Sequence, residues 1–119
     1  MIWFSSDLHF GHKNVISFCD RPFDYVADMH DALIANHNKL VHHDDTWICV
    51  GDFNFGTPAQ SASLLKQLNG FKVLVRGNHD KRGSANKFDL CVDKMTLTIA
   101  GVPVSVQHYP LRWADGTHE

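Results

Sequence analysis

Four apolar stretches of the sequence are each followed by side chains that can bind a metal ion. The atoms on offer are carboxylate oxygens, imidazole nitrogens and one amide oxygen, a set without thiolate that suits Mn²⁺, Fe or Zn²⁺. The residues are Asp7, His9, Asp52, Asn78, His79, Asp80 and His108. Because they are spread over most of the chain, they can act together only if the fold brings the four stretches to one place.

Asp52 is the residue best suited to hold two ions at once. A carboxylate has two oxygens, so it can bridge ions roughly 3.5–4 Å apart, as two-metal hydrolytic sites require. Gly51 precedes Asp52 and allows the backbone to turn sharply after the apolar run. The residue types therefore indicate a site for one or two divalent cations.

The pattern of apolar residues predicts the elements that must position this site. Three short apolar runs are typical of buried strands, and two amphipathic segments separate them. The runs are residues 1–5, 46–50 and 71–75, and the segments are residues 24–41 and 57–68. This alternation predicts an α/β fold with three adjacent parallel strands. Ligands bind at the carboxyl ends of such strands, so the polar residues should converge there.

The ends of the predicted helices carry residues that favour helix initiation. Asp24 is placed as an N-cap for the first helix, and Thr57 with Pro58 is placed to begin the second. Beyond Lys81 the pattern changes to short strands separated by turn residues, which predicts antiparallel hairpins. These strands are residues 90–92, 95–99 and 102–106.

Composition narrows the class of protein. A chain of 119 residues with 44% apolar residues and a net charge of −2 predicts one globular domain without a strongly basic surface for nucleic acid. The three cysteines include no Cys-x-x-Cys pair, and Cys49 lies in an apolar run, where a buried thiol is expected. No apolar run approaches the length of a membrane span, so we expect a cytoplasmic protein with no membrane partner.

The ordered motifs at these strand ends resemble those of the calcineurin-like metallophosphoesterases. The shared motifs are Asp7-x-His9, Gly51-Asp52, Gly77-Asn78-His79-Asp80 and His108. Further likeness to a small bacterial and phage subgroup lies in His9-Phe10-Gly11-His12-Lys13-Asn14, Arg21-Pro22-Phe23 and His108-Tyr109-Pro110-Leu111. The resemblance covers residues 2–113. It implies a mixed β-sheet sandwich flanked by helices, and a metal-dependent phosphoesterase.

The resemblance also implies a role for each matching residue. Asp7 and His9 would hold the first ion, Asp52 would bridge, and Asn78 and His108 would hold the second. A metal-bound hydroxide would attack the phosphorus of a phosphate mono- or diester, and His79 would protonate the leaving oxygen. Asp80 would either orient His79 or act as a loop residue that caps the next segment.

Substrate contacts follow less directly from the sequence. His12, Arg21 and Arg112 are the candidates, since imidazole and guanidinium groups suit phosphate oxygens, although each also fits an ordinary surface position. The substrate class stays open between a phosphorylated small molecule, a nucleotide and a nucleic-acid end.

The sequence departs from the family pattern after His108. The family's Gly-His-x-His turn is absent, so residues 1–119 read as a single phosphoesterase domain that is incomplete at its C-terminus. Each ion would then lose an imidazole, and we expect weak binding of the second ion and association with another copy of the chain. The alternative is a metal-binding or interaction module that keeps the fold without turnover.

Overall fold

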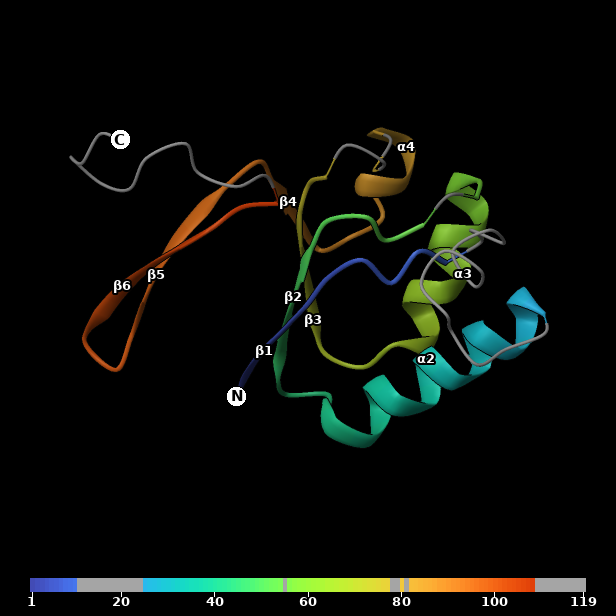
Figure 1. The fold of residues 1–119 in the computed structure, drawn as a ribbon, viewed down its shortest axis with the longest axis horizontal. Coiled ribbons are helices and arrows are strands. Elements are labelled where there is room, and N and C mark those ends of the chain that lie inside the picture. The colour runs from blue at the N-terminus through green and yellow to red at the C-terminus, as the bar shows by residue number, and fades with distance from the viewer. Residues whose placement is uncertain (11–24, 55, 78–79, 81, 109–119) are drawn as a thin grey trace.

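The computed structural model describes residues 1–10, 25–54, 56–77, 80 and 82–108. Figure 1 shows a twisted sheet with helices against one face and a long two-stranded hairpin that extends away from it. The elements are β1 (Ile2–Ser5), α2 (Val26–Leu40), β2 (Thr46–Val50), α3 (Pro58–Gln67), β3 (Phe71–Val75), α4 (Arg82–Ala85), β4 (Leu90–Val92), β5 (Met95–Ile99) and β6 (Val102–Val106). The predicted α/β class is confirmed.

The main sheet is parallel throughout, in the order β1-β2-β3-β4. Trp3 lies opposite Trp47, and Cys49 lies opposite Leu74, so the strands run in close register. The prediction that the first three strands are parallel and adjacent is therefore confirmed. All of these strands end at the same edge of the sheet.

The prediction for β4 is wrong. Instead of forming a hairpin with β5, this strand pairs parallel with β3, and Val75 lies opposite Val92. The segment between β3 and β4 contains the short helix α4, and it is long enough to carry the chain back for a parallel crossover. The hairpin of β5 and β6 is confirmed, with Ala100 and Gly101 both at positive φ in its turn, as tight hairpin turns require.

The helices cover one face of the sheet with a core rich in aromatic residues. This core contains Phe10, Val41, Trp47, Cys49, Phe53, Leu64, Leu65, Leu68, Leu74, Ala85 and Phe88. Thr57 caps α3 as predicted, and its hydroxyl accepts a bond from the amide of Gln60, whose side chain accepts in return from the Thr57 amide. The cap of α2 is Tyr25, without a side-chain bond, while Asp24 lies outside the described residues.

The hairpin packs against the opposite face of the sheet, where Ile48, Val73 and Val75 meet Val106. This second apolar cluster contains no residue of β1. Ile2 and Phe4 consequently stay 46% and 44% exposed, so the prediction of a fully buried first strand is wrong on this face. Within the described part of the chain, no helix is long and apolar enough to cross a membrane.

Asp45 ties the start of the chain to the loop before β2. Its carboxylate accepts bonds from the Met1 amino group at 2.9 Å, the Trp3 indole nitrogen at 2.9 Å and the His42 amide at 3.0 Å. The His42 amide first, then the Met1 amino group and the Trp3 indole, hold the pKa of this carboxyl well below its usual range. Asp45 therefore ties β1 to the loop that leads into β2.

We predict that Asp45→Asn removes a pH-dependent part of the stability. A depressed pKa in the folded state stabilises the fold above the unfolded carboxyl's pKa of about 3.9, and this contribution is lost as the pH falls further. In urea unfolding, the difference between wild type and variant should therefore be full at pH 7 and should shrink progressively as the pH falls from about 4 toward the depressed pKa of the folded state. Asp44→Asn at the exposed neighbouring position is the control, and an equal effect of both variants would contradict this account.

Candidate metal centre

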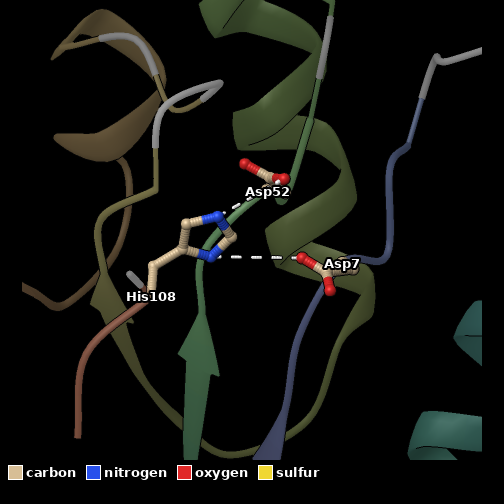
Figure 2. Close-up of side chains that lie close together, drawn as sticks. All are labelled: Asp7, Asp52 and His108. Atoms are coloured by element: carbon tan, nitrogen blue, oxygen red, sulfur yellow. Dashed lines mark ion pairs between the residues drawn. The ribbon is translucent and has the colours of Figure 1, made fainter. Parts of the chain in front are cut away.

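Residues from three distant parts of the sequence meet at the carboxyl edge of the sheet. Asp7 follows β1, Asp52 follows β2 and His108 follows β6. One potential ligand atom of each lies within 4.8 Å of those of the other two (Figure 2). Nε2 of His108 lies 3.6 Å from Oδ2 of Asp52, and its Nδ1 lies 4.0 Å from Oδ1 of Asp7. His9 joins the group, with Nε2 3.5 Å from the same Asp52 oxygen.

The backbone at these positions is strained. Asp7, His9 and Asp52 adopt left-handed conformations with φ of 55°, 56° and 53°. Besides them, the described residues contain only one other non-glycine residue with positive φ, Ala100 of the hairpin turn. Such strain persists where surrounding contacts hold it, and it concentrates at functional sites. Here the Asp7 amide donates to the Gly51 carbonyl and the His9 amide to the Asp52 carbonyl.

Two glycines make room for the site. A methyl group at Gly51 would overlap the imidazole ring of His108. One at Gly77 would lie 2.8 Å from Oδ1 of Asp52 and 2.9 Å from Cδ2 of His108. The glycines that precede Asp52 and Asn78 in the sequence motifs therefore let an imidazole approach two backbone segments closely.

The hydrogen bond of His108 determines which ring nitrogen can bind a cation. Its Nδ1 lies 3.0 Å from the carbonyl oxygen of Val50. A carbonyl can only accept, so the proton of this bond must be on Nδ1, and Nε2 of the neutral ring keeps its lone pair. That lone pair is on the nitrogen near the Asp52 carboxylate. A cation between the two satisfies both, and a ring N–H bonded to a backbone carbonyl is usual for metal-binding histidines.

Asp80 fixes the backbone around the site. Its carboxylate accepts bonds from the amides of Asp52 at 2.8 Å, Phe53 at 2.9 Å and Gly77 at 2.7 Å. Asp80 therefore joins the loops that follow β2 and β3. The sequence allowed a loop role for Asp80 as a cap of the next segment, whereas the amides that it binds all precede it. Its predicted action on His79 stays a prediction.

The structure thus brings Asp7, His9, Asp52 and His108 together, and their role as metal ligands stays a prediction. Other predicted residues lie outside the described part of the chain. These are the proposed ligand Asn78, the proposed general acid His79 and the proposed substrate contacts His12, Arg21 and Arg112. Asp52 and His108 are largely buried, whereas the Asp7 side chain is 58% exposed and leaves the site open on that side.

Comparison with known families identifies the family of this chain. Residues 1–112 match the family model of the calcineurin-like phosphoesterases. The chain belongs to this family. Calcineurin-like phosphoesterases as a class bind divalent metals, which agrees with the cluster of Asp7, Asp52 and His108.

Similar chains occur in Methanocaldococcus jannaschii and in mycobacterial phages. The chain is 42% identical over 84 residues to the uncharacterized protein MJ1445 of Methanocaldococcus jannaschii, covering 69% of this chain and 48% of the relative. It is 35% identical over 82 residues to the gene 66 protein of Mycobacterium phage L5, covering 66% of this chain and 39% of that protein. The chain thus spans less than half of either relative.

A solved structure has the same fold. The crystal structure of the protein of unknown function AQ665 from Aquifex aeolicus superposes with a TM-score of 0.80 and 30% sequence identity. The match covers 98% of this chain and 64% of AQ665. The described architecture is therefore shared with AQ665, of which this chain spans less than two thirds.

We predict that Gly51→Ala weakens metal binding and that Gly101→Ala does not. Both glycines have φ of 81°, so alanine at either position carries a similar backbone cost of about 1–2 kcal/mol. Only at Gly51 does the new methyl displace His108, since Gly101 has open space around it. Calorimetric titration with Mn²⁺ should show a loss of roughly tenfold or more for Gly51→Ala alone. Equal affinities of the two variants would contradict the role of this glycine.

Proposed function

We propose that this chain hydrolyses a phosphate mono- or diester with the help of two divalent cations. The observation that carries the proposal is the convergence of Asp7, Asp52 and His108 at the carboxyl edge of the sheet. Carboxylates and imidazoles within a few ångströms of one another form a ligand set for Mn²⁺, Fe or Zn²⁺. Membership of the calcineurin-like phosphoesterases supports the same reaction class.

In the proposed arrangement Asp7 and His9 would hold one ion, His108 and Asn78 would hold the other, and Asp52 would contribute to both. Cations bound there supply Lewis acidity toward a phosphoryl oxygen and lower the pKa of a water molecule. Asp52 is only 7% exposed, so little water screens its charge. The Asp7 side of the site is open, and we propose that the phosphate group enters there.

Each remaining residue has a positioning or proton-transfer role in this proposal. The Val50 carbonyl holds the His108 ring with Nε2 turned toward Asp52. Asp80 accepts hydrogen bonds from the amides of Asp52 and Gly77, which fixes the backbone just beyond β2 and β3. His79 donates a proton to the leaving oxygen. A general acid of this kind contributes about 10²–10⁴ in rate.

We predict that mutations can separate metal binding by Asp52 from proton transfer by His79. Asp52→Asn should lower bound metal and activity together, because it removes a charge that both ions share. His79→Ala should keep the metal content and lose roughly 10²–10⁴ in kcat. Metal analysis and hydrolysis of bis(p-nitrophenyl) phosphate with added Mn²⁺ measure both, and Asp44→Asn controls for loss of an exposed carboxylate.

The same experiment tests the alternative of a metal-binding module without turnover. Bound Mn²⁺ with no hydrolysis of mono- or diesters by the wild-type chain would favour that module. Unchanged metal content in Asp52→Asn would exclude the bridging role of this residue. Equal rates for wild type and His79→Ala would exclude His79 as the general acid.

A further inference from the structure

The outer edge of β1 carries backbone groups that are available for pairing with another strand. β1 is the first strand in the order β1-β2-β3-β4, and within the described part of the chain it pairs with β2 alone. The Thr46 amide donates to the Met1 carbonyl, so the carbonyl of Met1 faces β2. Alternate residues of a strand face the same neighbour, so the N–H and C=O groups of Ile2 and Phe4 point away from the sheet.

The side chains of these two residues form an uncovered apolar strip. Ile2 and Phe4 are 46% and 44% exposed, and Phe4 is in register with Ile48, which lies beneath the hairpin of β5 and β6. Residues 2–6 contain no charged side chain and no proline, which are the usual means of protecting an exposed strand edge. The edge of β1 therefore offers both backbone pairing and apolar contact.

The opposite face of β1 borders an apolar groove of about 210 Å³. Its lining comes from β1, Trp47 of β2 and one side of α2, including Leu33 and Leu40, and none of these described residues is Asp, Glu, Lys or Arg. His37 also lines the groove. Burial lowers the pKa of its imidazole, which is therefore neutral at pH 7. A strand added at β1 would meet apolar surface on both of its faces.

The other edge of the same sheet is protected by charge. β4 is flanked by Asp89 and Asp93, which are both exposed. The Asp93 carboxylate also binds Arg76, with Nη2 2.7 Å from Oδ1. A strand that approaches β4 would meet these charges at both of its ends, which disfavours edge-to-edge pairing there. The two edges therefore differ, and only β1 presents an uncharged one.

We propose that two copies of this chain associate by antiparallel pairing of their β1 strands. A two-fold axis beside Trp3 places Ile2 of one copy opposite Phe4 of the other, so the outward N–H and C=O groups of both residues are paired at once. The same symmetry brings the four exposed apolar side chains together on one face. A second copy fits this edge because the edge is complementary to itself and brings no like charges into contact.

This pairing gives a place on the molecule to the association with another copy that the sequence leads us to expect. It joins two four-stranded sheets into one continuous sheet, and it closes the exposed edge of each copy. The proposal concerns a surface formed by β1, and it does not depend on the proposed hydrolysis.

Phe4→Lys tests the pairing, because it places two ammonium groups close to the two-fold axis. Sedimentation velocity over a range of protein concentrations should show a dimer of the wild type, with a dissociation constant raised roughly tenfold or more in Phe4→Lys. Leu90→Lys is the matched control. Leu90 is 46% exposed and lies in the same row of the sheet as Phe4, through Ile48 and Val73, at the opposite edge.

The control should dimerise as the wild type does. A wild-type chain that stays monomeric, or equal weakening by Leu90→Lys and Phe4→Lys, would overturn the proposal.

A second variant, Ile2→Pro, tests the backbone bonds separately. Proline removes an outward N–H that bonds no described residue, so the fold should persist and the dimer should weaken. An unweakened dimer of Ile2→Pro would contradict pairing at this edge.

Amide hydrogen exchange on the wild type shows what covers the edge. The Phe4 amide should be protected at high protein concentration and exchange freely at low concentration, whereas the Trp3 amide, which faces β2, should be protected at both. A Phe4 amide that exchanges freely in the dimer would overturn the proposal. Protection of this amide in a monomer would assign the edge to another segment of the same chain, and would also overturn it.

Discussion

The peptide groups of residues 51–53 are hydrogen-bonded on both sides beyond the end of β2. Their carbonyls accept from the amides of Asp7, His9 and Phe10, and two of their amides donate to the Asp80 carboxylate. The pairing of the sheet thus continues into the loops that carry the proposed metal ligands. The site depends on this doubly bonded segment, because it sets where Asp7, His9 and Asp52 stand relative to one another.

The same hydrogen bonds stabilise the left-handed backbone of the site and hold its carboxylates close together. Left-handed backbone at Asp7, His9 and Asp52 is tolerated since amides and carbonyls on both sides hold it. The negative charges collected there also act on the buried Cys49. Burial first, and then the charges of Asp80, Asp7 and Asp52, raise the pKa of its thiol. Cys49 therefore stays a neutral packing residue beside the proposed metal ligands.

Local sequence patterns predicted the elements that make the site, and tertiary contacts determined the rest. The apolar runs at residues 46–50 and 71–75 and the Thr57-Pro58 helix start are confirmed because burial, capping and strand length act locally. The pairing of β4 was not predictable, since three residues carry no sign of which neighbour they join. Exposure of Ile2 and Phe4 depends on where the hairpin packs, which the alternation of residues does not encode.

The same distinction between local patterns and tertiary contacts applies to the site residues. Convergence of Asp7, His9, Asp52 and His108 was predictable from their places at strand ends, because parallel strands end at one edge. The hydrogen bonds that Asp80 and Asp45 accept from backbone amides could not be predicted. In the sequence, a carboxylate that binds amides looks like any polar turn residue.

His108 reaches the site from beyond the last strand, and this has a consequence for how the molecule folds. Its ring meets Asp7 across 101 residues of chain, so the full ligand set exists only after β6 has packed on the sheet. Contacts of such long range form slowly, because much chain must be ordered before they are made. A cation that needs all of these ligands would bind the completed fold and no earlier species. By mass action, each tenfold rise of free cation above its dissociation constant would add about 1.4 kcal/mol to the stability of that completed state.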